Sequence, residues 1–365
     1  MKIRTPILKP FVSKEAIEYA NKTLTSNWIG CGPRVKEFER KISNIIKNNL
    51  FLAVNSCSSA LNLAYEMCNI VEGDEVISTP ITCLATNIPI LARNAKPVWA
   101  DIKLDGTIDP AQVLSKITEK TKAIVAVHFG GNPCDIISLN KIAKDFNIPV
   151  IEDAAHALGA YYEDKPIGCH SDFVCFSFQS VKILTTVDGG GISFKNQDNY
   201  KICKNKRFFG IDRENRIIGD FNIEYIGYKM EMNDVIASIG LGNLKHFNKL
   251  IEHNRTLANK YITNLSNFSG LHLLFNNNCN KFPSFWLFPI LAQNKNDLQR
   301  KLYEHGIDSN PIHYRNDKVK LFARYKNSYL PNTERLSKEM LCLPIGFWVS
   351  IEEVERICEI IKGGW

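Results

Sequence analysis

The sequence predicts an α/β fold in which helices flank a mostly parallel central sheet, followed by a smaller α+β domain. Short apolar runs rich in β-branched residues alternate with amphipathic helical patterns through the first two thirds of the chain. The pattern changes after about residue 240. Because strands separated by helices need crossover connections, helices should cover both faces of a parallel sheet. We therefore expect a large α/β domain over residues 1–240 and a small C-terminal α+β domain over residues 241–365.

The elements of the large domain follow from apolar periodicity. Strands are expected at Leu52–Asn55, Glu75–Ser78, Pro97–Asp101, Lys122–Phe129, Pro149–Glu152 and Phe173–Phe178, and helices include Val35–Lys47, Ser58–Met67 and Ile136–Phe146. In such sheets ligands gather at the carboxyl ends of the strands. The small domain should begin with a long helical stretch, Asn233–Asn264, continue through an Asn-rich loop at Asn276–Asn280, and end with the amphipathic Ile351–Ile361.

Composition excludes several classes of protein. The 365 residues are 45% hydrophobic and 23% charged, as in globular proteins, and no run approaches the roughly 20 apolar residues that span a bilayer. Residues 1–11 lack the apolar region of a signal peptide, so a cytoplasmic protein is expected. The net charge of +7 is dispersed, which favours small anionic substrates over nucleic acid. Eleven cysteines without a C-x-x-C pair predict neither disulfides nor a metal site.

Lys182 is the first candidate for chemistry. It lies in a polar loop between an apolar strand that ends at Ser177 and three glycines, Gly189–Gly191, which allow close approach of the backbone to a ligand. A partly desolvated lysine has a lowered pKa and attacks carbonyl groups, as a Schiff-base lysine must. Taken alone, however, most lysines are solvated surface charges.

Two further segments supply what pyridoxal phosphate (PLP) needs around such a lysine. Asp153 ends a buried strand, where its carboxylate could keep the pyridine nitrogen protonated, and His156 could lie against the ring or bond its phenolic oxygen. Ser58 and Ser59 fall in the first turn of a helix, whose exposed N–H groups favour phosphate. Ordinary helix capping is the alternative for both segments.

The order of these segments carries a resemblance over almost the whole chain. The matching segments are Trp28–Pro33, Phe38-Glu39, Val54–Leu61, Gly73–Ile77, Ala95–Val98, Val127–Gly131, Ile151–His156, Ser177 to Gly190 with Lys182, Gly227–Lys229, Met232–Asp234, His313-Tyr314 and Leu343–Ile345. With them the chain resembles the DegT/DnrJ/EryC1/StrS family of PLP-dependent sugar aminotransferases. The resemblance implies the PLP-dependent transferase type I fold, that of aspartate aminotransferase.

The resemblance also implies roles for single residues. Lys182 would hold the cofactor as a Schiff base and move the proton, and Asp153 would pair with the pyridinium nitrogen. The remaining cofactor contacts would come from Cys57, Ser58 and Ser177 at the phosphate, His156 at the ring, and Lys229 at the phosphate of the neighbouring subunit. The last contact implies a homodimer with shared active sites.

Three positions depart from the family pattern. Cys83 follows Thr82 where relatives often carry an aromatic residue that stacks on the cofactor, Gln179 replaces a frequent His or Tyr, and Phe209 stands where many relatives have His. Since these residues surround the expected substrate pocket, they argue against borrowing a particular sugar from any relative.

The resemblance implies a ping-pong aminotransferase that takes an amino group from L-glutamate and gives it to a keto sugar, expected to be a nucleotide-linked 3- or 4-keto deoxyhexose. Candidate substrate-binding residues are Arg213, His313, Tyr314 and Arg315, with Arg207 and Arg216 as further cations; surface solvation is the alternative for each arginine. A dehydratase of the family would carry His in place of Lys182. A PLP-binding regulatory protein and an aminotransferase for non-sugar substrates remain alternatives.

Overall fold

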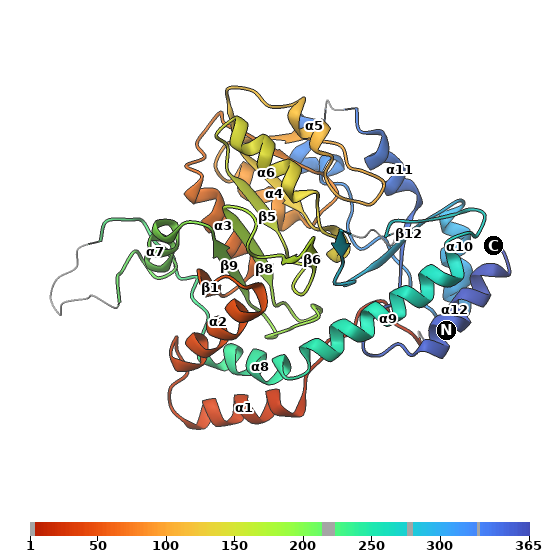
Figure 1. The fold of residues 1–365 in the computed structure, drawn as a ribbon, viewed down its shortest axis with the longest axis horizontal. Helices are drawn as coiled ribbons and strands as arrows, with labels where there is room; N and C mark the ends of the chain where they lie inside the picture. The colour runs from red at the N-terminus through yellow and green to blue at the C-terminus, as the bar shows by residue number, and fades with distance from the viewer. Residues whose placement is uncertain (1–3, 214–222, 276–279, 327–328) are drawn as a thin grey trace.

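The computed structural model describes residues 4–213, 223–275, 280–326 and 329–365, and within them the predicted α/β architecture is confirmed (Figure 1). The central sheet has seven strands: β1 (Phe51–Val54), β2 (Glu75–Ser78), β3 (Lys96–Trp99), β4 (Thr121–Val127), β5 (Val150–Asp153), β8 (Phe173–Ser177) and β9 (Gly190–Phe194). Their order in space is β1-β9-β8-β5-β4-β2-β3. Strand β9 runs antiparallel to both its neighbours, whereas β3, β2, β4, β5 and β8 pair in parallel. The six strands expected from the sequence are present, with bounds within two residues of those predicted.

Helices cover both faces of this sheet. The helices of this part are α1 (Lys14–Thr25), α2 (Pro33–Ile46), α3 (Cys57–Met67), α4 (Leu84–Leu91), α5 (Pro110–Leu114), α6 (Ile136–Asp145), α7 (Gln197–Lys206) and α8 (Asp234–Leu244). Apolar side chains of α2, α6 and α8 form one core with β5 and β8, and those of α3, α4 and α7 form a second core on the opposite face. Burial on two sides explains why these strands are apolar along their whole length.

Asp234 joins α8 to the start of α2. Its buried carboxylate accepts hydrogen bonds from the backbone N–H groups of Gly32, Arg34 and Val35 at 2.9–3.1 Å. It therefore caps a helix about 200 residues earlier in the chain, which satisfies N–H groups that have no partner within the helix. Two segments singled out from the sequence, Trp28–Pro33 and Met232–Asp234, thus meet in one helix cap.

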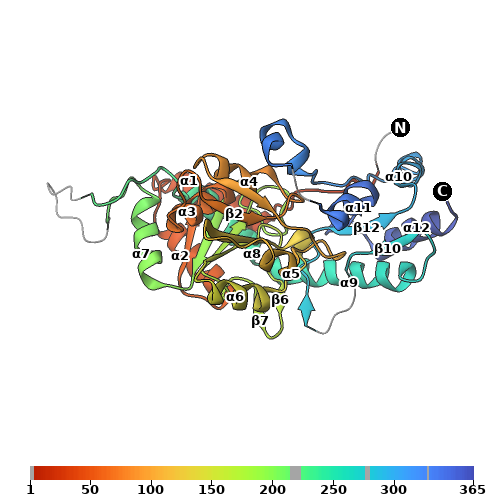
Figure 2. The same cartoon turned by 90° about the horizontal axis from the view of Figure 1, so that it is seen from above.

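The C-terminal part forms its own sheet and core. Strands β10 (Leu271–Leu273), β12 (Phe288–Ala292) and β13 (Met340–Leu343) make an antiparallel sheet, against which pack α9 (Phe247–Leu265), α10 (Lys295–Glu304), α11 (Pro331–Glu339) and α12 (Ile351–Lys362). Seen from above, these elements gather at one end of the molecule, with α9 leading to them (Figure 2). The small strands β6 (Tyr161–Tyr162), β7 (Lys165–Pro166) and β11 (Lys281–Phe282) form a third sheet.

The long helical stretch expected over Asn233–Asn264 is present as two helices, α8 and α9. The chain breaks at Lys245 and His246, whose N–H groups bond three residues back, and His246 contacts Glu15 of α1 at 3.0 Å. The predicted domain boundary at 240/241 falls inside α8, and the division into two domains stays a prediction. Most of the Asn-rich loop, residues 276–279, lies outside the described residues, as does Arg216. Across the described ranges no helix has the length and apolarity to cross a bilayer.

Gly190 allows β9 to lie against the start of α3. A Cβ atom at this position would fall 2.3 Å from the backbone nitrogen of Cys57 and 2.3 Å from the carbonyl carbon of Ser56. Both neighbours are backbone atoms, so no side chain could move aside.

Replacing Gly190 by alanine should therefore reduce the free energy of unfolding by about 1–3 kcal/mol or more, the usual cost of overpacking. Urea denaturation measures this change. Gly30→Ala is the matched control, because a Cβ atom there meets nothing within 4 Å, and should change stability by no more than about 0.5 kcal/mol. Equal stability of the two variants would contradict the close approach.

Candidate active site

Asp153 ends β5, at the edge of the sheet where β8 and β4 also end. It is 5% exposed, and its two carboxylate oxygens are held separately. The Thr86 hydroxyl donates to Oδ2 at 2.6 Å, and the Ala155 backbone N–H donates to Oδ1 at 3.1 Å. Thr86 is itself within 2.7 Å of the Thr82 hydroxyl. These contacts fix the direction of the carboxylate.

Lys182 lies in the loop after β8, which the backbone closes tightly. The Phe178 N–H donates to Gly189 O, and the Thr186 N–H donates to Phe178 O. The Lys182 Nζ atom lies 3.6 Å from the centre of the Trp286 ring. Burial lowers the pKa of Lys182 to about 8, although the neighbouring Cys57 and Asp153 act in the opposite direction. The structure thus provides the partly desolvated amine that the sequence predicted.

His156 belongs to a cluster of three rings beside this amine, in which it contacts both Trp286 and His313. Its ring stacks on Trp286, with centroids 3.9 Å apart, and lies parallel to His313 at 5.2 Å. Burial and the nearby Lys182 lower the pKa of both histidines, in His313 to about 4, so both rings are neutral. The Gly130 N–H donates to His156 Nδ1 at 3.2 Å, so the proton sits on Nε2, which is 3.4 Å from His313 Nε2.

The start of α3 lies beside Lys182. Ser56 caps this helix by accepting the Ser59 N–H, and Cys57 and Ser58 occupy its first turn. Burial raises the pKa of the Cys57 thiol, which therefore stays protonated. Because the first N–H groups of a helix have no partner within it, this turn can bind an anion. Ser177 ends the neighbouring β8, and together with Ala155, His156, Lys182 and Trp286 it lines one pocket.

Lys229 and Arg213 form a separate cluster. Both contact the carboxylate of Glu231, at 2.5 and 2.8 Å, and both lie over the ring of Phe208. The Lys229 side chain is 60% exposed. Neither residue is among those that line the pocket of Ala155, His156, Ser177, Lys182 and Trp286. Their predicted contacts with cofactor and substrate stay predictions.

Arg315 and Tyr314 differ in their surroundings. The Arg315 guanidinium is buried against Asp317, at 2.9 and 2.6 Å, and Glu334. These ion pairs favour a structural role, since they occupy the groups that a substrate phosphate would need. Tyr314 is 73% exposed. The candidate Arg207 is likewise paired, with Glu39 at 2.6 Å.

The family model for the DegT/DnrJ/EryC1/StrS aminotransferase family matches residues 10–362. The chain belongs to this family. The predicted resemblance, type I fold and enzyme class are therefore confirmed, and the aminotransferase can be compared with its relatives.

Similar proteins match from end to end. The GDP-perosamine synthase of Escherichia coli O157:H7 is 30% identical, with 98% of this chain and 97% of that protein aligned. The sugar aminotransferase CalS13 from Micromonospora echinospora is 30% identical, with a TM-score of 0.94 over 99% of this chain and 100% of that one. Spr1654 from Streptococcus pneumoniae in its PLP form is 27% identical, with a TM-score of 0.88 over 98% and 97% of the two chains.

Sequence reasoning missed two residues of the site. Trp286 lies more than 100 positions after Lys182, just before β12, and nothing in its local pattern distinguishes it from a core residue. Thr86 could have been found. It stands four residues after Thr82 at the start of a helix that follows a parallel strand, so a hydroxyl there falls at the carboxyl edge of the sheet.

The lowered pKa of Lys182 predicts selective reactivity. Below about pH 8 the amine is charged and unreactive, and above it the amine is neutral, whereas an ordinary lysine becomes half neutral only near 10.5. Brief labelling of the cofactor-free protein with an acylating reagent, read by peptide mass spectrometry, should give a rate for Lys182 that is half-maximal near pH 8. Lys249, which is exposed on α9, serves as the internal reference. Equal pH profiles for the two lysines would contradict the assignment.

Proposed function

We propose that this aminotransferase moves an amino group from L-glutamate to a nucleotide-linked keto sugar, with PLP as cofactor held by Lys182. One observation carries the proposal: Lys182, an amine whose pKa is lowered by burial, lies near Asp153, a buried carboxylate that is held by hydrogen bonds. The names of similar proteins add support for the substrate class, since one relative is a GDP-perosamine synthase.

The residues present fit PLP by their chemistry. Asp153 offers a fixed carboxylate for the ring nitrogen, and the helix start at Cys57 and Ser58 offers N–H groups for the phosphate, with the Ser177 hydroxyl nearby. His156 lines the same pocket, with its Nε2 3.4 Å from His313 Nε2. When bound, PLP supplies an electron sink for the bond that is broken at the substrate carbon.

Each residue then has a task that its surroundings allow. The Asp153 carboxylate, held in place by Thr86 and Ala155, would pair with the ring nitrogen of the cofactor. Lys182 would hold the cofactor through its amine and, when that amine is free, would move a proton as a general base, for which a pKa of about 8 is suited. Trp286 covers Lys182 and keeps water from it. Transfer proceeds in two halves, with the donor leaving before the sugar enters.

Cys83 lies exposed at the start of α4. Because a cysteine has no aromatic ring, it cannot stack on the cofactor as the aromatic residue of relatives would. The His156–Trp286 pair is the aromatic surface beside Lys182. We infer that the pocket's shape differs here from that of relatives with an aromatic residue at this position. His313 lies beside His156, and Tyr314 next to it in the chain is exposed; both remain our candidates for contact with the sugar.

We further propose a homodimer in which Lys229 completes the partner's site. Its side chain is 60% exposed and does not line the pocket of Lys182 and Trp286, so it is accessible for a contact across an interface.

The absorbance spectrum of the purified protein with PLP tests the donor half of the reaction. We expect a visible band that bleaches when L-glutamate is added, and its absence in Lys182→Ala. Lys249→Ala is the matched control and should behave as the native protein. Nucleotide-linked keto sugars, added after bleaching, should restore the band, whereas 2-keto acids other than 2-oxoglutarate should not.

A native protein that binds no PLP would contradict the proposal and favour a cofactor-free protein. A native protein that binds PLP, but whose band no amino donor bleaches, would contradict it in favour of a regulatory PLP-binding protein. Recovery of the band with several keto acids but no keto sugar would favour an aminotransferase for non-sugar substrates.

A further inference from the structure

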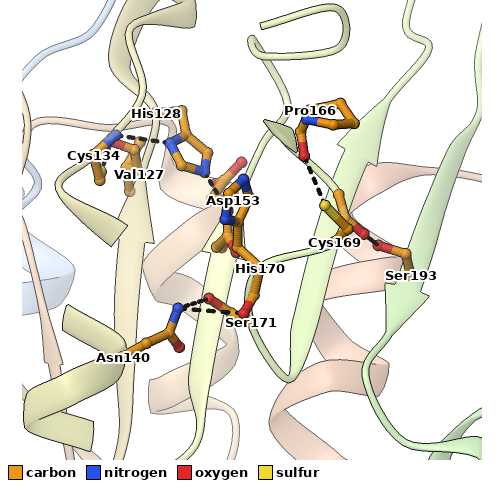
Figure 3. A network of polar contacts seen from close by, with 12 residues as sticks. Val127, His128, Cys134, Asn140, Asp153, Pro166, Cys169, His170, Ser171 and Ser193 are labelled. Carbon is orange, nitrogen blue, oxygen red and sulfur yellow. Dashed lines mark hydrogen bonds and ion pairs between the residues drawn. The ribbon is translucent and has the colours of Figure 1, made fainter. Parts of the chain in front are cut away.

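A histidine and a glutamate with no part in the proposed reaction are fully buried behind the site. His128 follows β4 and Glu152 lies in β5, on the sheet face opposite Asp153. His128 Nε2 is 2.8 Å from Glu152 Oε2, and both side chains are 0% exposed. Figure 3 shows the His128 ring between Cys134 and the end of β5.

The position of the proton on His128 follows from its second contact. The Cys134 backbone N–H donates to His128 Nδ1 at 3.0 Å. Although burial opposes it, contacts with Cys134 and Glu152 raise the pKa of His128 to about 10. A proton on Nδ1 would nevertheless point at the Cys134 N–H, so the geometry favours a neutral ring that donates from Nε2 to Glu152.

This pair is a poor device for stability alone. A buried carboxylate is costly unless its oxygens are compensated. Glu152 Oε2 has His128, but Oε1 has no hydrogen-bond partner among the described atoms. A pair of apolar side chains of similar volume would serve a purely structural purpose at least as well.

The His128–Glu152 pair lies where the turn after β4 meets the end of β5. The His128 N–H donates to Asp153 O at 3.1 Å, which extends the β4–β5 ladder to the catalytic carboxylate's own residue. The His128 carbonyl then accepts the Gly131 N–H at 3.0 Å and closes the tight turn η1 (Phe129–Gly131). This turn aims the Gly130 N–H at His156 Nδ1.

We propose that His128 and Glu152 are positioning residues: by fixing the turn after β4, they keep a backbone N–H on His156 Nδ1 and hold the His156 ring as the Nε2–H tautomer, whose proton lies toward His313 Nε2 at the edge of the pocket. The importance of this tautomer for catalysis rests on the proposed function, because an Nε2–H can donate to the cofactor, whereas a bare Nε2 cannot. The tautomer itself does not depend on any cofactor.

The test reads the His156 tautomer directly, by ¹⁵N NMR of the cofactor-free full-length chain labelled at its eight histidines. His156→Gln assigns the resonances. In the native protein we expect Nδ1 as an unprotonated acceptor and Nε2 as the protonated nitrogen. In Glu152→Ala we expect both nitrogens to shift to intermediate values, as in a mixture of tautomers. Glu152→Gln, whose amide oxygen can still accept from His128, should restore the native pattern.

A double variant separates positioning from stability. His128→Phe with Glu152→Leu removes both polar groups without leaving an unpaired charge, so it should fold even where Glu152→Ala does not. We expect it to remain folded, at a lower melting temperature because the Cys134 N–H loses its acceptor, and to lose the single His156 tautomer. Asp101→Ala is the matched control for loss of a buried carboxylate, because Asp101 bonds to Thr333 and Asn332 and contacts nothing in the site. It should keep the native tautomer despite its loss of stability.

A single Nε2–H tautomer of His156 in the folded double variant, or its loss in Asp101→Ala, would overturn the proposal. Neither result would bear on whether Lys182 binds PLP, and failure of Lys182 to bind PLP would leave the tautomer result standing.

Discussion

Desolvation of the Lys182 amine is the constraint on which the rest of the site depends. Burial makes the charged form of this lysine costly and so lowers its pKa. The face of Trp286, 3.6 Å from Nζ, and the nearby carboxylate of Asp153 surround the amine. These three features need different parts of the chain. The loop after β8 presents the amine, β5 presents Asp153, and Trp286 arrives from the segment before β12. Packing of the C-terminal part against the sheet therefore sets the reactivity of a residue in the first half of the chain.

The electrostatics of the neighbouring histidines follow from the same burial. Two neutral rings lie parallel beside the amine, since a charged imidazole there would face both a low dielectric and Lys182. Because each ring is neutral, the nitrogen that carries its single proton decides which side of the ring donates a hydrogen bond and which side accepts one. The Gly130 N–H sets the position of this proton for His156, whose Nε2 lies 3.4 Å from His313 Nε2; behind the site, the Cys134 N–H sets it in the same way for His128. The turn after β4 is thus as much a part of the site as the side chains that line the pocket.

Much of this could be predicted from the sequence because the chemistry lies at strand ends. Alternation of strands and helices predicts a parallel sheet, and its carboxyl edge gathers Asp153, Ser177 and the start of α3 whatever the details of packing. Contacts between distant segments could not be predicted. Nothing near Arg315 in sequence distinguishes a substrate-binding arginine from one paired with Asp317 and Glu334, and nothing near Trp286 connects it to Lys182. The break after α8 also depends on a distant residue, Glu15.

The central claim is that Lys182 is the residue that bonds covalently to PLP. Borohydride reduction of the protein with bound PLP, followed by proteolysis and mass spectrometry, tests it most directly, because reduction makes the linkage permanent at the residue that holds it. The account predicts a pyridoxyl group on the peptide that contains Lys182 and on no other lysine in stoichiometric amount. Labelling of a different lysine, or dispersed labelling over surface lysines, would contradict it.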